Sequence, residues 1–274
     1  MEILEEVKTN LLDDVLIDMP EAAPQKQQEN LQGVLGIVLL YRNPNLKDLK
    51  PFNKEMMGKK MCDWVKDALC GFATKSIACD EGSSIVPLIK PMLDSYKTAI
   101  VLYSDTPLLT QNTVSEILDY FNSRNLNVLK LPRGYVLDCE YIKNVDSVSD
   151  INLQEFNKDE FETVCDAKSF AKVNNLLKNR ILNFHAENGV MFEDINSCYV
   201  DAGVIIEPSA KICSNNVLKG ETYVGKNVVL EPNNIIENAI ISMNCIVKSS
   251  YIKNSKITEN MVVGPFELIE EKES

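Results

Sequence analysis

The residue best suited to chemistry in this sequence is Asp105, within the segment YSDTPLLT over residues 103–110. The preceding run, 98–103, is apolar and β-rich, which is typical of a strand buried on both faces of a parallel sheet. Thr110 suits the N-cap of a helix over 111–123. Asp105 is therefore expected at the carboxyl end of a central strand, where open α/β sheets bind ligands. A carboxylate there suits a divalent cation that holds a phosphate chain. The alternative is that Ser104 and Asp105 only cap a turn.

Composition limits the classes of function. The 274 residues carry a net charge of −12 and are 45% hydrophobic, which is ordinary for a globular protein. The acidic balance argues against nucleic acid as a partner, so a polyanionic substrate would need local lysines and a metal ion. Eight cysteines without a C-x-x-C pair, and a single histidine, argue against zinc and against a disulfide framework. Neither a signal peptide nor an apolar run of membrane-spanning length is present, so we expect a cytoplasmic protein with no membrane span.

The first two thirds of the chain predict an appendage followed by an α/β domain. Residues 1–32 read as a helix over 2–17 and a linker. Residues 33–165 alternate apolar strands with amphipathic helices, which predicts a doubly wound, Rossmann-like layer. We expect a helix over 85–96, kinked at Pro91, and strands over 127–131 and 134–138. The loop over 41–53 contains no glycine, so few backbone amides can approach a phosphate there.

Residues 166–190 are expected to connect this domain to a second one. Asp166 is a good N-cap, and apolar residues recur at helical spacing over 167–187. His185 lies near the end of this helix, where its charge would favour the helix dipole. Because it has no catalytic partner in the sequence, we expect His185 to be structural.

Residues 191–274 follow a period of six. One inward aliphatic residue per hexad predicts a short left-handed parallel β-helix with three faces per coil. The unbroken steps of six are Val200, Ile206, Ile212, Leu218, Val224, Leu230 and Ile236. With a few steps of five, the predicted series continues through Ile241, Ile246, Ile252, Ile257, Val263 and Ile269.

An α/β layer with an acid at a strand end, joined by one helix to a hexapeptide β-helix, resembles the bifunctional N-acetylglucosamine-1-phosphate uridylyltransferase/glucosamine-1-phosphate acetyltransferase family. The similarity is carried by 102–109, by FETV at 161–164 with VNN at 173–175, by ENGV at 187–190 and by VVGPF at 262–266. This resemblance implies a cytoplasmic enzyme of cell wall biosynthesis and a homotrimer assembled through the β-helix.

The resemblance also implies a set of site residues. Asp105 and Asn174 match the residues that bind Mg²⁺ between UTP and the sugar phosphate. Lys54 and Lys47 match the lysine and the arginine of the glycine-rich signature, which are catalytic. The candidates for substrate binding are Gly82, Ser83, Tyr103 and Ser104.

The sequence departs from the family in ways that weaken the prediction of activity. The signature glycines are missing, the segment between 131 and 161 is short, and the later coils that carry acetyl transfer are absent, so no acetyltransferase activity is expected. Two hypotheses remain open. One is a sugar-1-phosphate nucleotidyltransferase of the UDP-N-acetylglucosamine pyrophosphorylase type, with impaired or altered activity on UTP and UDP-sugars. The other is a non-catalytic nucleotide-binding or assembly module that trimerises through its β-helix.

Overall fold

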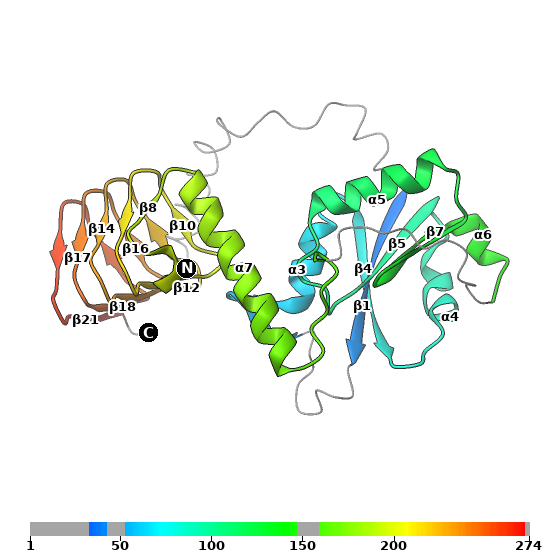
Figure 1. Ribbon diagram of the computed structural model, residues 1–274, viewed down its shortest axis with the longest axis horizontal. Coiled ribbons are helices and arrows are strands. Elements are labelled where there is room, and N and C mark those ends of the chain that lie inside the picture. The colour runs from blue at the N-terminus through cyan, green and yellow to red at the C-terminus, as the bar shows by residue number, and fades with distance from the viewer. Residues whose placement is uncertain (1–32, 43–52, 147–158, 272–274) are drawn as a thin grey trace.

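A computed structural model describes residues 33–42, 53–146 and 159–271. The chain forms an α/β part and a β-helix, with one long helix between them (Figure 1). The helix predicted over 2–17, and Lys47, lie outside the described residues. None of the described helices is long and apolar enough to cross a membrane. All eight cysteines lie in the described residues and none forms a disulfide, as expected.

The α/β part contains a mixed five-stranded sheet in the order β4-β1-β5-β7-β6. Parallel pairing joins β1 (Val34–Arg42) to β4 (Ala73–Asp80) and to β5 (Thr98–Tyr103). The other two strands, β6 (Val128–Leu131) and β7 (Gly134–Asp138), form a hairpin, so β7 runs antiparallel to β5. A small hairpin of β2 (Glu55–Met56) and β3 (Lys59–Lys60) stands apart from this sheet.

Helices cover both faces of the sheet, as the alternation of strands and helices predicts. On one face α3 (Met61–Ala68) and α5 (Gln111–Ser123) pack on alternate apolar residues of β1 and β5. The other face is covered by α4 (Ile85–Ile89), the 3-10 helix η2 (Lys90–Met92) and α6 (Cys139–Lys143). The prediction of one helix over 85–96 is wrong. The α-helix stops before Pro91, which has no N–H to donate and disfavours α geometry at the residue before it.

The connecting helix α7 has the predicted bounds, Ala167–Glu187. Asp166 and Ser169 form a capping box, in which each side chain accepts from the other residue's backbone amide. His185 is 6% exposed, and burial lowers its pKa to about 4, so it is neutral at pH 7. This agrees with the structural role expected for it.

The β-helix stacks short parallel strands in three sheets, as the hexads predict. The first sheet contains β8 (Met191–Phe192), β11 (Lys211–Ile212), β14 (Val229–Leu230), β17 (Ile246–Val247) and β20 (Val262–Val263). The second contains β9 (Tyr199–Val200), β12 (Val217–Lys219), β15 (Ile235–Glu237), β18 (Tyr251–Lys253) and β21 (Leu268–Glu270). The third contains β10 (Ile205–Ile206), β13 (Tyr223–Val224), β16 (Ile240–Ile241) and β19 (Lys256–Ile257).

The seven residues in steps of six are all buried in one core, but the predicted position Ile246 is wrong. Val247 is fully buried instead and pairs with Leu230 and Val263, whereas Ile246 is half-buried on the outer side. The step of five therefore falls between Val247 and Ile252. Both residues are aliphatic, so the sequence pattern alone cannot distinguish these registers, and only the ladder with the neighbouring coils does.

Asparagines stabilise the corners between these sheets. Inside the β-helix, the fully buried Asn234 donates to the side-chain oxygen of Asn216 at 3.0 Å, and its own oxygen accepts from the amide of Ser250 at 2.8 Å. On the outside, Asn227 and Asn244 adopt positive φ, which asparagine tolerates better than most residues. The Asn227 side chain donates to the side-chain oxygen of Asn244 in the next coil at 3.2 Å.

Candidate functional site

The candidate site is the carboxyl edge of the parallel strands, where Asp105 follows β5 as predicted. The amide of Ser104 donates to Leu39 of β1, and the Ser104 hydroxyl accepts from the amide of Tyr41. The amide of Val164 donates to the backbone carbonyl of Asp105 at 2.8 Å. These contacts fix the backbone on both sides of the carboxylate, whose residue is only 3% exposed.

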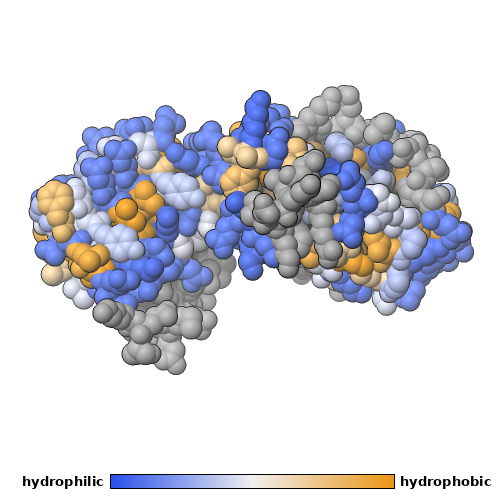
Figure 2. Space-filling model, turned by 90° about the horizontal axis from the view of Figure 1, so that it is seen from below, coloured by the Kyte–Doolittle hydropathy of each residue, from blue (hydrophilic) through white to orange (hydrophobic). Residues whose placement is uncertain are grey.

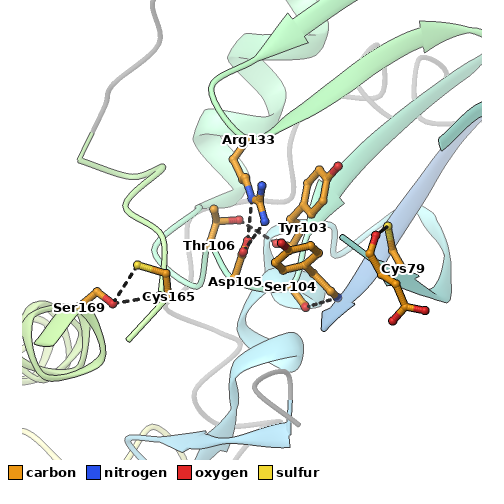
Figure 3. Close-up of polar contacts among 10 residues, drawn as sticks. Cys79, Tyr103, Ser104, Asp105, Thr106, Arg133, Cys165 and Ser169 are labelled. Atoms are coloured by element: carbon orange, nitrogen blue, oxygen red, sulfur yellow. Dashed lines mark hydrogen bonds and ion pairs between the residues drawn. The ribbon is translucent and has the colours of Figure 1, made fainter. Parts of the chain in front are cut away.

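The partner of Asp105 is Arg133, a residue that the sequence analysis did not single out. Its Nε donates to Oδ1 at 3.1 Å and its Nη2 donates to Oδ2 at 2.6 Å, so the guanidinium binds both carboxylate oxygens (Figure 3). Such two-point pairing is among the stronger charge-assisted interactions in proteins. Arg133 belongs to the two-residue turn between β6 and β7, and its side chain is 28% exposed.

Two tyrosines hold the guanidinium in place. Its carbon lies 4.0 Å from the ring centroid of Tyr103 and 4.6 Å from that of Tyr41, within cation–π range of both rings. Burial raises the pKa of Tyr103 to about 12, so the phenol is neutral at pH 7. Burial acts to lower the pKa of Arg133, but the hydrogen bonds and the charge of Asp105 outweigh it and raise that pKa. Arg133 is therefore a permanent cation at this edge.

Two further predicted residues, Lys54 and Asn174, are neighbours of residues in an apolar cluster that contains Leu108 and Val164. Lys54 lies over the ring of Phe170 on α7, 5.3 Å from its centroid. Phe170 packs on the cluster that contains Val164 and Val173. Asn174 follows the fully buried Val173 and is itself half-buried. The fold thus gathers segments from three parts of the chain near the Asp105 loop, and a role for Lys54 or Asn174 stays a prediction.

The predicted substrate-binding residues have different surroundings. Gly82 and Ser83 are exposed in the loop that follows β4, at the same edge of the sheet. Tyr103 is half-buried and faces Arg133. The Ser104 side chain is fully buried and already hydrogen-bonded, so it offers no surface to a ligand in this arrangement.

The contacts of Asp105 decide whether the site fits the Mg²⁺ ion that the family resemblance implies. Both carboxylate oxygens of Asp105 accept hydrogen bonds from the Arg133 guanidinium. A metal ion would have to displace this guanidinium to bind either oxygen on that side. Among the described residues, no group of three or more His, Cys, Asp or Glu side chains could hold a metal. As arranged here, the Asp105 site does not fit a divalent ion.

The sequence around Arg133 contains a pattern from which its position near Asp105 could be predicted. Pro132 and Arg133 lie between two apolar runs, a spacing that indicates a two-residue hairpin, and Gly134 follows directly. Because β7 pairs antiparallel with β5, the turn between β6 and β7 lies at the same edge of the sheet as Asp105. Both strands are predictable from their apolar runs, and the position of Arg133 follows only once β7 is placed beside β5.

The fold is therefore a three-layer α/β domain with an acidic strand end, followed by a hexapeptide β-helix. The chain is similar to the bifunctional protein GlmU of several bacteria. It is 37% identical to that of Clostridium kluyveri over 99 residues, or 36% of this chain and 22% of the relative. The identity to the protein of Clostridium acetobutylicum is 40% over 98 residues, which cover 36% of this chain and 22% of the relative. The identity to the protein of Streptococcus thermophilus CNRZ 1066 is 33% over 124 residues, which cover 45% of this chain and 26% of the relative.

These similarities confirm the resemblance that the motifs indicated. The matched region spans only about a quarter of the length of these relatives. No protein-family model matches the chain.

Proposed function

We propose that this protein is a sugar-1-phosphate nucleotidyltransferase-like module that binds UTP or a UDP-sugar with impaired turnover, and that assembles through its β-helix. The observation that carries the proposal is the pairing of Asp105 with Arg133 at the strand end where a ligand would bind. The loop over 41–53, which contains no glycine, also supports it. Transfer of phosphoryl groups depends on positioning and charge, so a loop without glycine and a carboxylate already paired with Arg133 disfavour turnover more than binding.

The chain's own residues supply the binding chemistry. Asp105 accepts from two of the five N–H donors of Arg133 and Tyr41 is a further side-chain hydrogen-bond partner, which leaves other donors for a phosphate. Lys54 supplies a second cation, and the exposed loop with Gly82 and Ser83 would border the base. Val164 and Ser104 hold the Asp105 segment in position.

Nucleotide binding is tested by calorimetric titration of the full chain with UTP and with UDP-N-acetylglucosamine. We expect saturable binding without added Mg²⁺, and a loss of about tenfold or more in the Lys54→Ala variant because a charged contact to phosphate is removed. Lys211→Ala is the matched control, since Lys211 is exposed on β11 of the β-helix, and its affinity should not change. If neither nucleotide binds at millimolar concentration, only the assembly module remains.

Assembly as a homotrimer is proposed from the outer surface of the β-helix, where apolar side chains are visible (Figure 2). In the second sheet the outward position is apolar or aromatic in all five coils, at Tyr199, which packs against the cluster that contains Val173, and at Val217, Ile235, Tyr251 and Leu268. Lysines interrupt the corresponding columns of the first and third sheets, at Lys211 and Lys256. The second sheet is therefore the face we propose for the subunit contact.

We expect light scattering at micromolar concentration to give a mass about three times the 30.8 kDa of one chain. Ile235→Lys places a charge in the middle of the proposed contact and should produce monomers, because Ile235 is 41% exposed and not part of the core. Lys211→Ala serves again as the control. A monomeric parent protein would contradict the proposal, and a trimeric Ile235→Lys variant would move the contact to another face.

A further inference from the structure

The pair formed by Asp105 and Arg133 is held by more restraints than an ordinary ion pair. Asp105 is 3% exposed, and backbone hydrogen bonds of Val164 and Ser104 fix the segment that carries it. The guanidinium lies against the rings of Tyr41 and Tyr103. Both partners are therefore preorganised, and little side-chain freedom remains to be lost when they meet.

The backbone of the β6–β7 hairpin also restrains Arg133. Gly134, the next residue, has φ +142° and approaches β5 so closely that an added Cβ would lie 2.3 Å from the carbonyl oxygen of Val101. Only glycine allows this approach, which brings the turn onto the strand that ends at Asp105. The position of the guanidinium is thus set by the sheet, and not only by its own rotamer.

A guanidinium in this position has the electrostatic consequences of a bound cation. It neutralises the buried carboxylate, occupies both oxygens and stands within hydrogen-bonding distance of each. A second cation at the same oxygens would lie within a few ångströms of the first, and repulsion at that distance is strong in a partly buried site. Mg²⁺ is also reluctant to lose its waters, which disfavours entry further.

We infer that Arg133 is a built-in cation that takes the place of a divalent metal ion at Asp105, and that Arg133 and a divalent ion exclude one another there. Asp105 then acts as a positioning residue for Arg133, not as a metal ligand. The inference concerns this pair alone and does not depend on nucleotide binding. It predicts that a neutral residue at position 133 creates a divalent-cation site in a protein that otherwise has none at Asp105.

The test uses Mn²⁺ alone as the probe, with free Mn²⁺ followed by electron paramagnetic resonance. We expect Arg133→Ala to gain one Mn²⁺ site that the parent protein lacks, at least about tenfold tighter than any site of the parent. The double variant Arg133→Ala, Asp105→Asn should lose this site again. Arg124→Ala is the matched control, because Arg124 lies over the ring of Tyr120 but is exposed. It should behave like the parent.

Circular dichroism establishes that each variant is folded. Should Arg133→Ala not fold, Arg133→Gln carries the test, since glutamine is neutral and keeps a planar polar end between the tyrosine rings. Arg133→Lys keeps the charge and should still exclude Mn²⁺, which a merely steric role would not require. The inference is overturned if the parent protein binds Mn²⁺ at a site that Asp105→Asn removes. It is equally overturned if folded neutral variants at position 133 gain no site.

Discussion

Replacing Ile212 by Asp is expected to unfold the β-helix. Ile212 is the second residue of β11 and is fully buried. Its side chain lies in the core that the coils share. An aspartate there loses the packing of the isoleucine and buries a charge with no partner, at a cost of at least about 4 kcal/mol. Because most domains are stable by only about 5–15 kcal/mol, thermal unfolding followed by circular dichroism should show a transition far below that of the parent, or none.

Lys211→Asp is the matched control, since it changes the neighbouring residue of the same strand. Lys211 is exposed, so its replacement should alter the free energy of unfolding by less than about 1 kcal/mol. If Ile212→Asp melts like the parent protein, the inward register of the hexads would be wrong.

Replacing Gly134 by Ala is expected to destabilise the α/β part and to break the pair formed by Asp105 and Arg133. The new Cβ would meet the carbonyl oxygen of Val101 at 2.3 Å, and this oxygen belongs to a central strand that cannot move freely. The hairpin must therefore separate from β5, at a cost of about 3 kcal/mol or more. Chemical denaturation measures this loss, and a crystal structure or the chemical shift of the Arg133 Nε–H reports whether the pair survives.

Gly82→Ala separates the effect of close approach from that of backbone strain. Gly82 also has positive φ, +76°, but a Cβ there would meet nothing within 4 Å. Only the strain of a left-handed alanine remains, so the expected cost is about 1–2 kcal/mol. Equal losses in the two variants would contradict the contact between the β6–β7 hairpin and β5.

The predicted effects of Gly134→Ala and of the Arg133 variants are linked through one short hairpin. Gly134 places the turn, the turn places Arg133, and Arg133 neutralises Asp105. A change at Gly134 or Arg133 should leave the buried Asp105 carboxylate without its partner, which is strongly unfavourable, whereas a change at Asp105 leaves the guanidinium unpaired. Measured together, the variants should therefore show losses of stability that are not additive.

Periodicity in the sequence was sufficient to predict the larger elements, but not the small hairpin of β2 and β3 or the helix α6. Steps of six identified the β-helix, the spacing of apolar residues with Asp166 as N-cap identified α7, and an apolar run before Asp105 identified β5. Each of these signals is local, because a strand or a helix face is read from residues a few positions apart. The local signal fails where two aliphatic residues are adjacent, as at Ile246 and Val247, or where proline interrupts a helical pattern, as at Pro91.

Only the tertiary structure decided what Asp105 contacts. Arg133 is 28 residues away along the chain, and Tyr41 is on a third segment that joins the site through the parallel pairing of β1 with β5. A carboxylate at a strand end is compatible with a metal ion, a helix cap or an ion pair, and its own residue type does not distinguish them. The antiparallel insertion of β7 beside β5 brings one guanidinium to that carboxylate, and this pairing across the sheet cannot be read from either segment by itself.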